Sequence, residues 1–181
     1  MPTPYVDTYT DRVVSSILDF NYPRHIKYSF LERGSDERQY CSPGTELPVV
    51  GLSRSKYECY PEYHTSLDNL NFVSAEGLES SLHYLKDYIQ LLEENRAYKA
   101  ICLGEPNLGK RGLYPTSNSK TSWLPFRNLL NFLAYADGRN DLIKMSSLLK
   151  VSPSNLYPIV KKLMQAGLIE AVDNERVCHE V

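Results

Sequence analysis

The sequence predicts an α/β chain in two parts, the closing half of a layered α/β domain followed by a small winged helix-turn-helix. Up to residue 98, amphipathic helical segments alternate with short apolar runs, which is the order of elements in an α/β layer. After residue 123, three helical segments precede two short strand-like runs, as in a winged helix-turn-helix. We therefore divide the chain into residues 1–98, a connecting strand and loop at 99–122, and the winged-helix part at 123–181.

Helical and strand periodicities define the elements of the first part. Apolar residues recur at helical spacing over residues 10–20, behind Thr10 or Asp11 as the cap. Residues 25–31 alternate as a strand does, with Ile26, Tyr28 and Phe30 on one face, and Ser35 is placed to cap a short helix. The continuous apolar run LPVVGL at residues 47–52 favours a strand buried on both faces. These elements are too few for a complete α/β domain, so we expect only its closing half.

A long helix follows, with Ser74 as its cap. Its apolar residues form one stripe at spacings of four, three, four and three: Leu78, Leu82, Leu85, Ile89 and Leu92. A stripe of this kind indicates a packing face and not a reactive site.

The second part begins after a possible strand at residues 98–103. Helices are predicted at 124–136, where Asp137-Gly138 gives the stop signal, and at 141–150. A third helix is stopped by Gly167; because of Pro158 it either begins near Leu156 or is kinked. Residues 168–172 and 176–179 flank a turn, as the strands of a wing do.

Composition places the chain among soluble globular proteins. It has 181 residues, 42% hydrophobic and 23% charged, with a net charge of -2. No apolar run approaches the roughly 20 residues of a membrane-spanning helix, and the first residues do not resemble a signal peptide. We therefore expect a cytoplasmic location and no membrane partner. The cysteines form no CxxC pair, which argues against a structural zinc knuckle.

Residues 104–111, GEPNLGKR, nearly match a phosphate-binding loop. Arg111 stands where the magnesium-binding hydroxyl belongs, and the following Gly112 to Pro115 cannot open the helix that would hold phosphates. We expect no nucleotide cofactor.

The role of His64, in the loop YPEYHTSLDNL at residues 60–70, is open from composition and spacing alone. A zinc site needs about three protein ligands. The other histidines, at positions 25, 83 and 179, share no ligand spacing with it. His64 is therefore either a metal ligand or a hydrogen-bonded structural residue.

Four motifs in order narrow the choice: GSDERQYCSPG at 34–44, YPEYHTSLD at 60–68, LGKRGLYP at 108–115 and LLNFLAYADG at 129–138. Together, from about residue 10 to about residue 172, they resemble the C-terminal part of a bacterial subgroup of the two-zinc aminopeptidase family. That family includes leucyl aminopeptidases and glutamate carboxypeptidase, and the subgroup is often encoded near polysaccharide biosynthesis genes. The resemblance implies a zinc-peptidase-like α/β domain and a terminal winged-helix segment.

The resemblance also implies roles for four residues. His64 matches the last histidine ligand of zinc, and Tyr63 matches a tyrosine that hydrogen-bonds the tetrahedral oxyanion. Asp36 matches an aspartate that lines the site without binding metal, and Asp68 matches a residue placed to orient the ligand loop or cap its turn. A packed aromatic ring for Tyr63 and a helix-cap carboxylate for Asp36 are the structural alternatives.

The chain departs from the family in its remaining ligands. The family's reaction needs two zinc ions and a glutamate base, held by an H-x-D strand end, a bridging aspartate, a Glu-Glu pair and a further aspartate. No H-x-D occurs here, and Glu93-Glu94, the only adjacent glutamate pair, follows His64 in the chain instead of preceding it. We expect a fragment of an aminopeptidase-like hydrolase that is inactive alone, and the sequence leaves open whether it is itself an enzyme.

The alternative function is a non-catalytic interaction or DNA-binding module acting through the winged helix. Its third helix lacks a dense basic stripe, so we do not expect nucleic acid as a partner. The expected partners are a peptide-like substrate for a completed enzyme, and an N-terminal half or a second copy of the chain.

Overall fold

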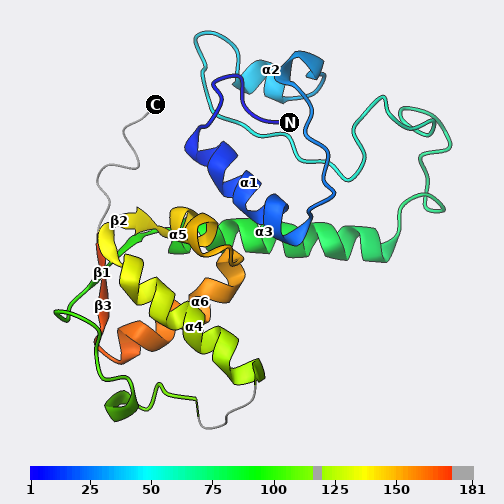
Figure 1. The fold of residues 1–181 in the computed structure, drawn as a ribbon. Helices are drawn as coiled ribbons and strands as arrows, with labels where there is room; N and C mark the ends of the chain where they lie inside the picture. Colours follow the sequence, from blue (N-terminus) through cyan, green and yellow to red (C-terminus); the bar gives the residue numbers. More distant parts are fainter. Residues whose placement is uncertain (116–119, 173–181) are drawn as a thin grey trace. The chain divides into compact units, whose positions relative to one another are not determined.

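The computed structural model describes residues 1–115 and 120–172, with side chains described from 123 onward in the second range, and divides into two compact units, Met1–Gln90 and Leu91–Val181 (Figure 1). The first unit is helical with long loops, and the second combines three helices with a small antiparallel sheet. The predicted mixed α/β class with a winged helix-turn-helix is confirmed.

Helix α1, Tyr9–Asn21, opens the first unit. Its N-cap is Thr8 and not Thr10 or Asp11 as predicted, and the side chains of Thr8 and Asp11 form a reciprocal capping box. The Asp11 carboxylate also accepts hydrogen bonds from the backbone N–H of Thr3 at 2.9 Å and from its hydroxyl at 2.6 Å. These bonds hold the segment before α1 against the start of the helix, above buried Val13 and Ile17.

The two strands predicted in the first unit are not formed, so that prediction is wrong for this chain. Residues 25–31 lie in a loop that ends in the 3-10 helix η1, Phe30–Glu32. Within residues 47–52, Leu47 and Leu52 are exposed, and Gly51 pairs with Met1 alone through two backbone hydrogen bonds. A strand needs a row of partner backbone groups, and residues 1–90 supply none.

Two further helices complete the first unit. The short helix α2 spans Glu37–Tyr40, and the long helix α3 spans Ala75–Glu94, with its last turn in the second unit. The Ser74 hydroxyl accepts a 3.0 Å hydrogen bond from the Gly77 N–H, which confirms the predicted cap of α3. The predicted stripe forms on α3, yet Leu78 to Ile89 along it are exposed and not packed.

The sheet of the second unit has the strand order β2-β1-β3. Strand β1, Ala97–Ala100, pairs antiparallel with β3, Ile169–Val172, from Ala97 opposite Val172 to Ala100 opposite Ile169. On its other side β1 pairs with β2, Asp137–Asp141, through an irregular register. The sequence predicted Asp137-Gly138 as a helix stop and Asp141 as the start of the next helix, but no strand between them; DGRND forms this edge strand.

Three helices build the winged-helix unit with that sheet: α4, Lys120–Tyr135; α5, Leu142–Leu149; and α6, Pro153–Gln165. Helix α6 begins at Pro153 and includes Pro158, so a start near Leu156 is wrong. The largest fully buried side chains of the second unit are Tyr98, Phe132, Leu91, Leu142, Met145, Leu156, Leu163 and Leu168. The predicted wing strand at 176–179 lies outside the described residues.

Among the described residues, every helix is too short or too polar to cross a membrane.

Candidate functional site

A buried carboxylate organises the turn before α2. Glu37 accepts hydrogen bonds from the backbone N–H groups of Gly34 at 2.8 Å and Ser35 at 3.0 Å, and from the Tyr57 hydroxyl at 2.8 Å. Ser35 therefore does not cap the helix as predicted; Asp36 holds the N-cap position without a side-chain bond. The Glu37 side chain folds back and accepts from the N–H groups of the two residues that precede the N-cap.

The hydrogen bonds set the ionisation of this pair. Burial by itself would raise the pKa of Glu37, but the N–H groups of Ser35 and Gly34 and the Tyr57 hydroxyl outweigh it and lower the pKa to about 2. Burial and the Glu37 carboxylate raise the pKa of Tyr57 to about 12. Glu37 is therefore an anion and Tyr57 a neutral donor throughout the physiological range.

Tyr57 approaches the turn so closely that a side chain at position 34 would force the ring or the turn to shift. A Cβ atom on Gly34 would lie 2.7 Å from Cε2 of the Tyr57 ring. The Tyr57 hydroxyl also donates to the Glu32 carbonyl at 3.2 Å, and the Lys56 ammonium lies 4.3 Å from the centre of the Tyr57 ring. Sequence reasoning missed Glu37, Tyr57 and Gly34 as site residues; the signal available was a carboxylate three residues after a glycine at the start of a helix.

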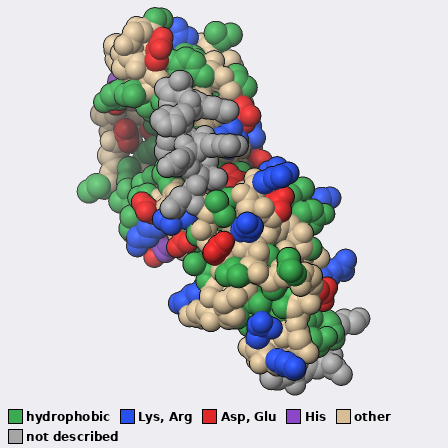
Figure 2. All heavy atoms as spheres, turned by 90° about the vertical axis from the view of Figure 1, so that its left-hand side faces the viewer, with side chains coloured by type: hydrophobic (Ala, Val, Ile, Leu, Met, Phe, Trp, Pro, Cys, Tyr) green, Lys and Arg blue, Asp and Glu red, His purple; other side chains and the backbone are tan. Residues whose placement is uncertain are grey.

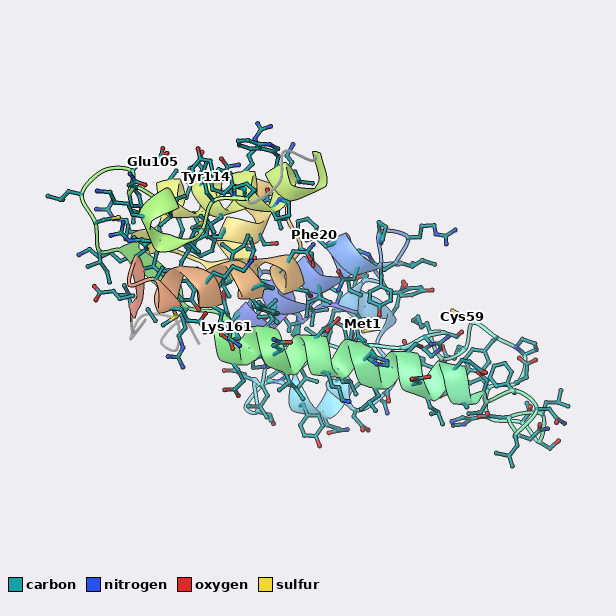
Figure 3. All side chains as sticks on the ribbon, turned by 90° about the horizontal axis from the view of Figure 1, so that it is seen from below. Met1, Phe20, Cys59, Glu105, Tyr114 and Lys161 are labelled. Carbon is teal, nitrogen blue, oxygen red and sulfur yellow. The ribbon has the colours of Figure 1, made fainter. Side chains whose placement is uncertain are left out.

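Tyr57 also contacts the loop that bears His64. Its ring centre lies 6.3 Å from that of Tyr63, and the Tyr63 ring stacks on the His64 imidazole with centres 4.1 Å apart and planes at 28°. Tyr60 packs edge-on against Tyr63 and stacks on Phe72. Figure 3 shows this loop, marked by Cys59, at the N-terminal end of α3. The aromatic contacts bring the GSDE turn and the YPEYH loop together.

The backbone at His64 has a left-handed conformation, with φ of +55°. Histidine is among the residues that tolerate this region, although it is uncommon outside glycine. A tight turn imposes it, since the Thr65 N–H and hydroxyl both bond the Glu62 carbonyl, at 3.1 and 2.9 Å. The imidazole is exposed and stacked on Tyr63, so the turn presents it to the surroundings of the loop.

Asp36 and Asp68, the two predicted site carboxylates, are both exposed. Within the described residues neither carboxylate hydrogen-bonds His64, and Asp68 enters the loop's bonding through its backbone N–H to the Thr65 carbonyl at 3.2 Å. Arg54, one of two basic residues after the 47–52 run, donates to the Gly77 carbonyl at 3.2 Å and to the Ser80 hydroxyl. Arg54 thus ties this segment to α3.

A cavity of about 260 Å³ adjoins the Glu37–Tyr57 pair. Its lining includes Tyr28, Ser35, Glu37, Lys56 and Tyr57. The ammonium of Lys56 and the carboxylate of Glu37 give it both charges.

The donor set does not fit a complete zinc site. Over residues 1–115 and 120–172 the structure brings together no group of three histidine, cysteine, aspartate or glutamate side chains able to hold a metal. A zinc ion held by protein alone needs about three such ligands. His64 is one such side chain, and the described residues bring no second and third donor beside it.

Comparison with family models divides the chain in two. Residues 2–95 match a family described as a domain of unknown function (DUF4910), and residues 96–171 match a winged helix-turn-helix model. The boundary falls in the short link between α3 and β1.

One curated protein and one solved structure, both from Clostridium acetobutylicum, are similar to this chain. One, named as a candidate polysaccharide biosynthesis protein with an aminopeptidase-like domain, is 36% identical over 149 residues, which are 80% of this chain and 33% of that protein. The other is the crystal structure of a candidate peptidase, with a TM-score of 0.74 and 29% identity over 94% of this chain and 38% of that one. This chain therefore spans between a third and two fifths of either relative.

Proposed function

This chain belongs to the family described as a domain of unknown function (DUF4910), and from that premise we propose that it is the C-terminal part of a zinc-dependent aminopeptidase-like hydrolase. Its similarity to a protein with an aminopeptidase-like domain and to a candidate peptidase supports an aminopeptidase-like assignment. We further propose that the chain alone is inactive, because it carries one zinc ligand of the set that the reaction needs.

The presentation of His64 is the observation that carries the proposal. An exposed imidazole on a left-handed turn, with its ring stacked on Tyr63, is available to a ligand that approaches the loop. Through Tyr63 and Tyr57 the loop is connected to the turn that bears Asp36. An arrangement that fixes a surface histidine costs backbone strain, which is common at functional positions.

In the completed enzyme the four residues have separate roles. His64 binds zinc through a ring nitrogen, and Tyr63 donates its phenol proton in a hydrogen bond to the oxyanion formed from a peptide-like substrate. Asp36 lines the site beside the Glu37–Tyr57 pair, and Asp68 orients the His64 loop.

Metal analysis tests the proposal. The purified chain alone should hold much less than one zinc per molecule and show no aminopeptidase activity. A chimera in which this chain replaces the matched third of the Clostridium acetobutylicum relative should hold about two zinc ions. His64→Ala should lower that content to about one, and His83→Ala, at an exposed histidine of α3, should leave it unchanged. Tight stoichiometric zinc with activity in the chain alone contradicts the proposal.

A second candidate function is an interaction through the winged helix. Between Asp141 and Glu170 there is no carboxylate side chain, while four lysines are exposed there: Lys144, Lys150, Lys161 and Lys162. That charge pattern favours an anionic partner. Against it, the face in Figure 2 shows basic side chains dispersed among acidic and neutral ones, and α6 exposes Pro158 and contains no arginine. We therefore rank nucleic-acid binding second.

A further inference from the structure

Helix α3 carries three rows of side chains, each at alternating spacings of three and four. Figure 1 shows α1 beside α3. One row of α3 faces the end of α1, where the Tyr84 ring lies 5.9 Å from that of Tyr22 and Asp87 accepts a hydrogen bond from Asn21 at 3.4 Å. A second row is polar and exposed: Glu76, Glu79, His83, Lys86 and Gln90. The third, which we call the leucine row, consists of Leu78, Leu82, Leu85 and Ile89.

The leucine row is apolar and uncovered. Its side chains are 65%, 51%, 48% and 56% exposed, in chain order. Apolar side chains scattered singly on a surface need no explanation, but a row of four on one helix face marks an interaction site. The helix already packs its first row on α1, so the leucine row is a second apolar face left for another partner.

The part of the relatives that lies outside the match is the occupant this row suits. We propose that the leucine row docks on an apolar sheet face of the peptidase-like domain, supplied by the portion that the relatives have outside the residues matched by this chain. This inference rests on the proposed function. The matched residues form 33% of the curated relative and 38% of the solved chain, so most of either protein is available to provide that face.

Over residues 1–90 the first unit has no sheet on which α3 could pack. Helices of α/β domains pack their apolar stripes on a sheet. Residues 1–90 are all described and form no strand, so no sheet within this unit can cover α3. The extended run at 47–52, with Leu47 and Leu52 exposed, is likewise without neighbouring strands. A sheet from the remaining portion would cover the row and pair that run.

The test co-expresses the tagged chain with the part of the Clostridium acetobutylicum relative outside the 149 matched residues. Capture on the tag and light scattering then measure the complex. Leu82→Asp with Leu85→Asp places two carboxylates on the leucine row. His83→Asp with Lys86→Asp is the matched control, because it places two carboxylates at the same spacing on the polar row. The part of the relative outside the match is the probe. In a positive control the relative's own matched residues replace this chain, and their binding shows that the probe is folded.

We expect a one-to-one complex for the unaltered chain and for the control variant. The leucine-row variant should bind at least about a hundredfold more weakly, because burial of each leucine contributes about tenfold or more. Both variants should keep their circular dichroism when alone, since the substituted side chains are exposed. If the charged variant unfolds, Leu82→Ser with Leu85→Ser replaces it.

Three results overturn the inference. In the first, the probe binds the relative's own matched residues and not this chain. In the second, the complex survives the leucine-row substitutions. In the third, the chain forms a homodimer that these substitutions break, since apolar spacings of four and three also suit a pair of packed helices. Zinc content separates this inference from the proposed function. If the complex forms but holds no zinc, the docking inference stands and the proposed zinc-dependent function is wrong.

Discussion

The Tyr57 hydroxyl donates a 2.8 Å hydrogen bond to the carboxylate of Glu37, and this bond joins two segments that the resemblance to aminopeptidases had placed in one site. The carboxylate belongs to the GSDE turn, and the Tyr57 ring continues through Tyr63 to His64. The position of the His64 loop relative to the turn therefore depends on a pair of residues that have no predicted role in metal binding.

Tyr57→Phe removes that bond and keeps the ring. We expect the first unit to lose about 1 kcal/mol of stability, the net contribution of a partly exposed hydrogen bond. Faster hydrogen exchange at the Gly34 and Ser35 N–H groups should follow, because both bond the same carboxylate. Tyr60→Phe is the control, since Tyr60 contributes ring contacts. Equal exchange in both variants contradicts the role given to the Tyr57 hydroxyl.

Stability should depend on pH through Glu37. Its folded pKa of about 2 lies below the ordinary value of 4.5, so ionised Glu37 stabilises the fold above pH 4.5, and this contribution is lost as the pH falls from 4.5 to about 2. Glu37→Gln keeps an acceptor oxygen and does not titrate. Urea unfolding of the first unit, followed by circular dichroism, should show the native chain more stable than the variant at pH 7 and the two converging near pH 2. A constant difference across this range would falsify the assignment.

Gly34→Ala tests the close approach of Tyr57. The added methyl group would lie 2.7 Å from the ring, so the ring or the turn must move, which costs about 1–3 kcal/mol. Gly51→Ala is the control, because its Cβ would meet only Met1, at 3.7 Å. In a Tyr57→Ala background the cost of Gly34→Ala should shrink, since the clashing ring is gone. An unchanged cost means that backbone conformation and not the ring requires the glycine.

Local sequence predicted the helices of this chain better than its strands. Helices α1, α3 and α5 were predicted because their signals, periodicity and caps such as Ser74, lie within the segment itself. The runs at 25–31 and 47–52 have strand composition, but a strand is made by its neighbours, and these have none. Strand β2 shows the reverse case, because DGRND lacks an apolar alternation and is a strand through its pairing with β1.

The site was predictable to a similar extent. Motif order pointed to the His64 loop and the Asp36 turn, and both form tight turns in the structure. Their connection through Glu37 and Tyr57 depends on a contact across 20 positions, which no local pattern encodes. By sequence Glu37 is an ordinary first-turn acid, and its burial and its hydrogen bonds, which arise only in the fold, distinguish it.

The second unit offers an independent stability test at Asp141. Its carboxylate caps α5 by accepting the Lys144 N–H at 2.8 Å, and it accepts a hydrogen bond from the Asn95 amide at 3.2 Å. Asp141→Ala should destabilise this unit by about 1–2 kcal/mol. Fluorescence of Trp123, the only tryptophan, reports unfolding of this unit. Tyr57→Phe should leave that transition in place, and a shared shift would mean that the two units unfold together.

Binding to duplex DNA distinguishes a DNA-binding role of the winged-helix unit from an interaction that involves no nucleic acid. We expect no shift of a random duplex with about 1 μM chain at low salt, because non-specific binding at useful affinity requires several phosphate contacts. The exposed lysines of α6, Lys161 and Lys162, are the side chains to test. A shift that weakens steeply with salt and is lost on Lys161→Ala with Lys162→Ala, but not on Lys86→Ala in α3, would overturn this expectation. It would make the α5–α6 pair a nucleic-acid interface, since only phosphate contacts by those lysines give both the salt dependence and the loss.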